Sequence, residues 1–281
     1  MGDLEHDTRL TGSDGTYEGS LPEDWGIWGP NGGFVGAVLL RAAGSHAELA
    51  RPASLAVAFL RRGDFGPVQL ATRTLRRTRR AEAVAVSMTQ DARPIAEALA
   101  WFVLDALPSP GHDVAPLPDV PRPDGLESND EHRLRLGLPD PPFRFFENVE
   151  QWPVTWSDTW PPPGPLPPVS ETWFRFRPTA TFTDPLVDAG RLVVTLDTMG
   201  WPAATRHHAW AWPADSQPWV APSLDLHVRF HRPSGDSPHL FQRVEAPHSG
   251  DGLLTTEGRV WSEHGLLLGS SASQLLWTAA G

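Results

Sequence analysis

Alternating hydrophobic and polar residues occur in two separate parts of the chain. The apolar members of the two alternations are Leu55, Val57 and Phe59 in the first part and Leu224, Leu226, Val228 and Phe230 in the second. A period of two residues is typical of a strand with one buried face. We therefore predict strands over residues 54–61 and 223–232.

Each of these strands follows a predicted helix. Residues 34–43 are apolar on all sides, which is typical of a buried helix. Residues 184–199 begin with Asp184 as an N-cap and Pro185 at the first helical position. Further strands are predicted over residues 68–75, 83–90 and 95–104 in the first part and over residues 240–246, 255–262 and 266–277 in the second.

The order of elements indicates an internal duplication. Laying Phe59 on Phe230 aligns the two alternations without a gap, and each is preceded by a helix and followed by a meander of strands. A long helix wrapped by an antiparallel sheet is the hotdog arrangement. We predict an α+β double hotdog whose two sheets join edge to edge, with both helices on one side, because that pairing covers one edge of each sheet.

Proline separates the two parts. Sixteen of the thirty prolines fall between residues 108 and 168, and proline is excluded from central strands and helix interiors. The predicted organisation is a lead-in without regular structure (1–24), a first hotdog (25–107), a Pro-rich linker (108–169) and a second hotdog (170–281). Aromatic residues predict that the linker is held against a surface: Phe143, Phe145, Phe146, Trp152, Trp156 and Trp160.

Composition narrows the class of protein. A net charge of −11 argues against nucleic acid as a partner, and 40% apolar residues with thirteen tryptophans argue against disorder. Without a long apolar run or a signal-like start, we expect a cytoplasmic protein with no membrane partner. The absence of cysteine excludes disulfides and thiolate sites. No metal is expected, because His207, His208, His227 and His231 have no partner at a recognised ligand spacing, and no cofactor is expected either.

Four segments carry a family resemblance. They are Gly29-Pro30-Asn31-Gly32-Gly33-Phe34, residues 54–61, Thr89-Gln90-Asp91-Ala92-Arg93-Pro94, and residues 223–233. In order and spacing they resemble the acyl-CoA thioesterase II family, and the likeness covers about residues 25–105 and 170–277. The resemblance implies hydrolysis of acyl-CoA thioesters by a water that an aspartate, a threonine and a glutamine orient.

The matching catalytic residues here are Asp197, Ser223 in place of threonine, and Gln274. Asp197 shares a helix stripe with Leu186 and Val193, and a carboxylate on the core side is costly unless it is hydrogen-bonded. There it could act as a general base. The alternatives from the residues alone are a solvent-facing helix end, a strand-starting serine and an exposed strand amide.

Three other features have a functional and a structural interpretation. Asn31, Gly32 and Gly33 precede a helix, so their N–H groups could bind substrate at a developing oxyanion, or they could form a tight helix entry. The basic cluster Arg73, Arg76, Arg77, Arg79 and Arg80 could contact coenzyme A phosphates or be a solvated turn. Tryptophans 201, 210, 212 and 219 could line an acyl tunnel or pack between elements.

Two rival functions stay open. A hotdog enoyl-CoA hydratase would pair an aspartate with a histidine, which Asp197, Pro202 and His207 suggest, but Trp201 precedes that proline where such enzymes carry asparagine. A non-catalytic acyl-binding hotdog protein is the other rival. A serine-hydrolase elbow is absent. We expect self-association, most simply a homodimer, unless the linker covers the exposed sheet surfaces.

Overall fold

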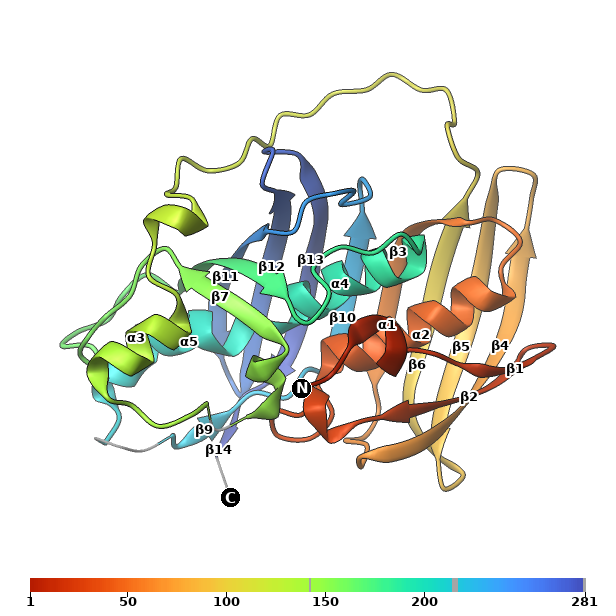
Figure 1. The fold of residues 1–281 in the computed structure, drawn as a ribbon. Helices are drawn as coiled ribbons and strands as arrows, with labels where there is room; N and C mark the ends of the chain where they lie inside the picture. Colours follow the sequence, from red (N-terminus) through yellow and green to blue (C-terminus); the bar gives the residue numbers. More distant parts are fainter. Residues whose placement is uncertain (142, 214–216, 280–281) are drawn as a thin grey trace.

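In the part of the chain that the computed structural model describes, residues 1–141, 143–213 and 217–279, twelve strands form one antiparallel sheet. The sheet curves around two helices that pack against each other, α2 (Gly32–His46) and α4 (Pro185–Thr198) (Figure 1). Both helices lie on the same side of the sheet. The predicted α+β double hotdog is confirmed.

The strand order of the second half mirrors that of the first. From the outside inwards the first half runs β1 (Thr11–Ser13), β2 (Thr16–Leu21), β4 (Gly66–Arg77), β5 (Ala81–Gln90), β6 (Arg93–Val103) and β3 (Arg51–Phe59). From the inside outwards the second half runs β10 (Asp225–Phe230), β13 (Leu267–Leu276), β12 (Leu253–Ser262), β11 (Leu240–Gly250), β8 (Val169–Phe176) and β7 (Val149–Pro153). The two halves therefore meet at the β3–β10 pair.

The register at this junction agrees with the alignment of Phe59 on Phe230. Ala56 lies opposite His227, and the pairs on either side of it are arranged symmetrically. Irregularities in the sheet also recur: β5–β6 shifts register between Met88 and Thr89, and β12–β13 shifts between Val260 and Trp261. The predicted edge-to-edge join is therefore confirmed.

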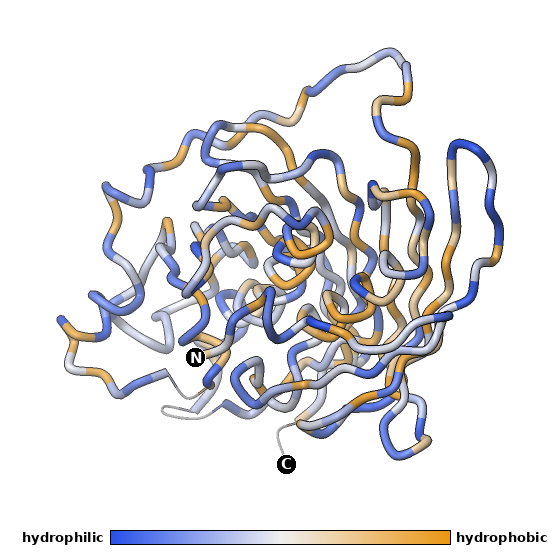
Figure 2. The backbone as a smooth tube through the Cα atoms, turned by 45° about the vertical axis from the view of Figure 1, so that its right-hand side comes forward, coloured by the Kyte–Doolittle hydropathy of each residue, from blue (hydrophilic) through white to orange (hydrophobic). Residues whose placement is uncertain are grey.

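Small residues let the two helices approach closely. A Cβ on Gly33 would lie 2.7 Å from Val194 Cα, and one on Gly36 would lie 2.8 Å from Val193 Cγ1. At position 33 the near atom is backbone and cannot move aside, whereas a side chain at position 36 would force the Val193 side chain to shift. Hydrophobic residues follow the helices and the sheet, and hydrophilic residues gather at the hairpin turns (Figure 2).

The N-terminal segment is ordered, so the prediction of a lead-in without regular structure is wrong. It forms α1 (Leu4–Asp7), β1, β2 and η1 (Glu23–Trp25). β2 extends the sheet beyond β4, and the buried Trp25 ring stacks on Phe34 with 4.9 Å between ring centroids. In β2 only Tyr17 and Leu21 are buried, which is too sparse a pattern to indicate a strand.

The linker arches over the top of the molecule in Figure 1 and then covers the outer face of the second half. An aromatic cluster on that face, Trp173, Phe241 and Trp261, packs against Leu117, Val120, Leu126 and Trp152. The indole N–H groups of Trp173 and Trp261 donate to the carbonyls of Pro121 and Ala115 at 2.9 and 2.8 Å. The linker also contains η2 (Pro123–Gly125), α3 (Asn129–Leu136), η3 (Arg144–Glu147) and β7.

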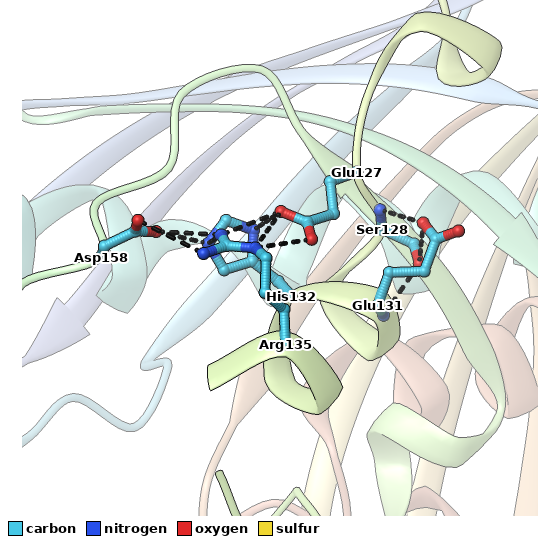
Figure 3. Close-up of polar contacts among 6 residues, drawn as sticks. All are labelled: Glu127, Ser128, Glu131, His132, Arg135 and Asp158. Atoms are coloured by element: carbon cyan, nitrogen blue, oxygen red, sulfur yellow. Dashed lines mark hydrogen bonds and ion pairs between the residues drawn. The ribbon is translucent and has the colours of Figure 1, made fainter. Parts of the chain in front are cut away.

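Polar contacts fix α3 to the rest of the linker (Figure 3). His132 lies between Glu127 and Asp158, at 2.7 and 2.8 Å, and its ring lies 3.9 Å from that of Trp156. Arg135 contacts the same two carboxylates. Ser128 and Glu131 form a capping box at the start of the helix.

The region after α4 contains a helix that the sequence did not predict. The chain passes from Met199 into α5 (Gly200–His208) and η4 (Ala209–Ala211). Pro202 lies in the first turn of α5, where a missing N–H is tolerated. β9 (Trp219–Val220) and β14 (Thr278–Ala279) pair separately. None of the described helices combines the length and apolar character needed to cross a membrane.

Candidate active site

The C-terminal end of α4 meets the N-terminal end of α2, and a carboxylate lies at the contact. Asp197 Oδ2 accepts a hydrogen bond of 2.7 Å from the Gly33 amide. Its Oδ1 accepts one of 3.0 Å from Ser223 Oγ. Ser223 precedes β10 and pairs with Leu275 of β13. The structure therefore brings together Asp197, Ser223 and Gly33, whose positions are far apart in the sequence.

Glycine at both positions 32 and 33 makes this contact possible. A Cβ on Gly32 would lie 2.9 Å from Asp197 Oδ2 and 3.1 Å from the Phe59 ring, and one on Gly33 would collide with the backbone of α4. The Gly-Gly pair therefore allows the backbone of α2 to approach the carboxylate.

Burial raises the pKa of Asp197 above the ordinary value of an aspartate, because desolvation disfavours the charged form. The hydrogen bonds from Ser223 and Gly33 act in the opposite direction, since both stabilise the carboxylate. Desolvation is the larger effect. A carboxylate with a raised pKa is a stronger base than an exposed one once it has lost its proton.

A cavity of about 430 Å³ opens at this point. Asp197 and Ser223 line it, and most of the remaining lining is apolar or aromatic, including Trp28, Phe59, Phe143, Phe146, Trp201 and Leu224. Trp28 meets both Trp201 and Phe143 edge to face, at 5.7 and 6.3 Å between ring centroids. Apolar walls with a few convergent polar groups are typical of a ligand site.

The predicted substrate-binding residues have distinct positions. Asn31 caps α2, because its side chain accepts a hydrogen bond of 2.9 Å from the Phe34 amide. The Gly33 amide is occupied by Asp197. The Gly32 amide belongs to the first turn of α2, where N–H groups have no acceptor within the helix, and this residue lines the cavity.

The structure does not bring Gln274 to Asp197 and Ser223. Gln274 is not among the described residues that line the cavity, although the next two residues of the chain, Leu275 and Leu276, are. The Gln274 side chain is engaged instead by β12, because its Oε1 accepts a hydrogen bond of 3.1 Å from Thr255 Oγ1. Of the three expected catalytic residues, Asp197 and Ser223 are hydrogen-bonded to each other, and the role of Gln274 stays a prediction.

The predicted tryptophans and the basic cluster lie partly at the cavity and partly at the surface. Trp201 lines the cavity, whereas Trp210 and Trp219 are exposed. None of the predicted basic cluster lines the cavity, and Arg77 of that cluster pairs with Glu48 and Glu82.

Sequence reasoning missed Arg61 and Arg62, which line the cavity, and the cavity role of Phe143 and Phe146. The aromatic content of the linker indicated that it contacts a surface, but not which one.

Two family models match this chain. One describes the acyl-CoA thioesterase N-terminal domain and matches residues 21–103, and the other describes the acyl-CoA thioesterase C-terminal domain and matches residues 112–277. No curated protein matches the chain.

Solved structures share the fold over nearly the whole length. A conserved protein of unknown function with hot dog fold from Alicyclobacillus acidocaldarius is 21% identical, with a TM-score of 0.81 and coverage of 99% of this chain and 98% of that one. The acyl-CoA thioesterase II TesB2 from Mycobacterium marinum is 22% identical, with a TM-score of 0.77 and 99% coverage of each chain. The tesB protein of Mycobacterium avium subs paratuberculosis is 19% identical, with a TM-score of 0.77 and 98% coverage of each.

Proposed function

Because this chain belongs to the acyl-CoA thioesterase family, we propose that it hydrolyses acyl-CoA thioesters to the free acid and coenzyme A. The observation that carries the proposal is the Asp197 carboxylate, which lines a mostly apolar cavity with Ser223 and the start of α2. The apolar lining suits an acyl chain. The carboxylate supplies a base beside it.

In the proposed reaction Asp197 activates a water molecule. Ser223 gives its only hydroxyl hydrogen to Asp197, so the lone pairs of its oxygen accept a hydrogen bond from that water. The carboxylate takes one proton from the water as the hydroxide adds to the thioester carbonyl carbon. When the tetrahedral intermediate collapses, the C–S bond breaks and the proton on Asp197 passes to the leaving thiolate.

The start of α2 stabilises the charge that develops on the carbonyl oxygen. The Gly32 amide and the positive end of the helix dipole favour a negative charge at this position. Arg61 and Arg62 line the same cavity and supply positive charge for the phosphates of coenzyme A.

A screen of acyl-CoA esters of increasing chain length, read by release of free thiol, tests the proposal. Replacing Asp197 by asparagine keeps the shape and removes the base, so turnover should fall by roughly 10²–10⁴-fold. Ser223→Ala should slow turnover as well, whereas Ser223→Thr keeps the hydroxyl and should preserve it. Undiminished hydrolysis by Asp197→Asn would mean that this carboxylate only joins the two helices.

The two rivals predict different results. A hydratase needs an acid beside the base, and no histidine is among the described residues that line the cavity. Addition of water to an enoyl-CoA, without thiol release, would nevertheless establish that activity. Binding of acyl-CoA with no turnover across the whole screen would establish a non-catalytic acyl-binding protein.

A further inference from the structure

A second cavity occupies the position related to the first by the internal duplication. It has a volume of about 360 Å³. The displacement that carries Phe59 onto Phe230 also carries residues 59–62, which line the first cavity, onto residues 230–233, which line the second. The same displacement relates residues 50–53 of the second cavity to residues 221–224 of the first.

The helices correspond as well, with a smaller shift in residue number, because more residues separate α4 from β10 than separate α2 from β3. When the two N-cap residues Asn31 and Asp184 are laid on each other, Gly32 and Val35 of the first cavity correspond to Pro185 and Asp188 of the second. The two cavities are therefore built from equivalent positions of two copies of one fold.

The second cavity lacks the reactive pair. The counterpart of Ser223 is Pro52, and the counterpart of Asp197 is Gly44, against which Leu186 packs. Asp188, a carboxylate in its lining, is fully engaged: Oδ2 accepts from the Ser234 amide at 2.8 Å, and Oδ1 accepts from Ser234 Oγ and from Arg191 at 3.1 Å. A ligand held here would meet no group equivalent to the proposed base.

The features that suit an acyl-CoA ester are retained. Ala53, Val103, Leu192 and Phe230 are among the apolar lining residues. Arg232 is the counterpart of Arg61, and Arg51 adds a second guanidinium. Arg232 Nη1 contacts Asp113 of the linker at 2.5 Å. Both arginines and Asp113 are accessible at the surface, so a phosphate can take the place of the aspartate on Arg232.

We propose that the second cavity binds a further molecule of acyl-CoA and does not hydrolyse it. The ligand class rests on the proposed function, because it is taken from the equivalence with the first cavity. One chain then has one site that hydrolyses acyl-CoA and one site that only binds it. The two sites are related by the internal duplication.

The test measures how many acyl-CoA molecules bind to each chain in a variant that does not hydrolyse them. Asp197→Asn, titrated with a medium-chain acyl-CoA by calorimetry, should bind two molecules per chain. Ala53 lies at a bulge of β3 and has no partner in β6, so Ala53→Trp can fill the second cavity without breaking a strand pair. Leu224 is its counterpart in the first cavity, and Leu224→Trp is the matched control. Each tryptophan should reduce the stoichiometry from two to one, and the two together should abolish binding.

A double variant that reverses two charges tests the same cavity without a bulky side chain. Arg51→Glu combined with Arg232→Glu should weaken one of the two binding events by about tenfold or more, because charge-assisted contacts to phosphate are lost. The other binding event should keep its affinity. Ala53→Trp in the otherwise unchanged chain should hydrolyse acyl-CoA at the rate of the parent when substrate is saturating.

A stoichiometry of one that Leu224→Trp abolishes would overturn the inference while leaving the proposed hydrolysis intact. Binding of the free acid in place of the acyl-CoA ester at the second cavity would overturn the ligand class. Two bound esters with no hydrolysis by the parent chain would overturn the proposed function but support the second site.

Discussion

The Asp197 carboxylate is removed from bulk water by folding, and this has a consequence for stability as well as for chemistry. Its pKa is raised in the folded chain, so between the ordinary aspartate pKa and the raised value the folded state holds a proton that the unfolded state has lost. Stability from this residue is present at low pH and is lost as the pH rises through the folded pKa. At neutral pH this residue therefore destabilises the fold.

Asp197→Asn should therefore raise the melting temperature at pH 7 while it lowers turnover. The difference from the parent chain should shrink as the pH falls below about 4, where aspartate is protonated in both states. Thermal unfolding of both chains across this pH range measures the effect, and kcat/KM of the parent should rise with pH with a midpoint above the usual aspartate range. A variant less stable than its parent at pH 7 would contradict this account.

At the level of residues, the sequence predicted the site in part. Asp197 and Ser223 were found because a carboxylate on a core-facing stripe and a hydroxyl at a strand start match a family pattern, and the structure joins them. Gln274 was placed by the same pattern, but a sequence pattern does not give the hydrogen-bond partner of a strand side chain, which here is Thr255 of β12. The donation from Gly33 to Asp197 depends on helix packing, which no local pattern encodes.

At the level of elements, the contact of α2 with α4 decides whether the site forms. In Gly33→Ala the new methyl group would lie 2.7 Å from Val194 Cα, a backbone atom that cannot move aside. We expect a loss of about 3 kcal/mol in the free energy of unfolding and a fall in activity as Asp197 moves. Denaturant unfolding measures the first. Gly111→Ala is the control, because nothing lies within 4 Å of a Cβ at that position, and equal stability of both variants would refute the packing argument.

The linker contributes walls to the first cavity through Phe143 and Phe146. Phe143→Ala should enlarge the cavity beside Trp28 and shift the preferred acyl group towards longer or bulkier chains. The ratio of kcat/KM for long and short acyl-CoA esters measures the shift. Trp160→Ala, at an exposed position of the same linker, should leave the ratio unchanged. An unchanged ratio in Phe143→Ala would place the acyl chain elsewhere in the cavity.

The elements that were predicted differ from those that were missed in whether they bury one regular face. The strands and helices of both halves bury a regular face, so their periods are visible in the sequence. β7 follows a proline-rich stretch at the edge of the sheet and owes its place to pairing with β8. α5 begins at Gly200 with Pro202 in its first turn, residues that locally indicate the end of a helix.

At the scale of the whole molecule, the described part of the linker packs on the outer sheet face of the second half. On the equivalent face of the first half, Leu99 and Trp101 of β6 are half-buried. We therefore expect a homodimer through this face, and Trp101→Arg should give a monomer with its fold intact. Light scattering at micromolar concentration measures the mass. A monomeric parent chain would refute the expectation.

The central strand pair, β3 with β10, has a consequence for how the protein is made. β3 leaves the ribosome long before β10 is synthesised. In the same way, α2 is complete well before its packing partner α4 is made. At about 5–20 residues per second, the ribosome needs on the order of ten seconds to translate the chain between the end of β3 at Phe59 and the start of β10 at Asp225. Throughout that interval the nascent first half carries an open strand edge and an uncovered helix face, both of which favour aggregation until the second half is made.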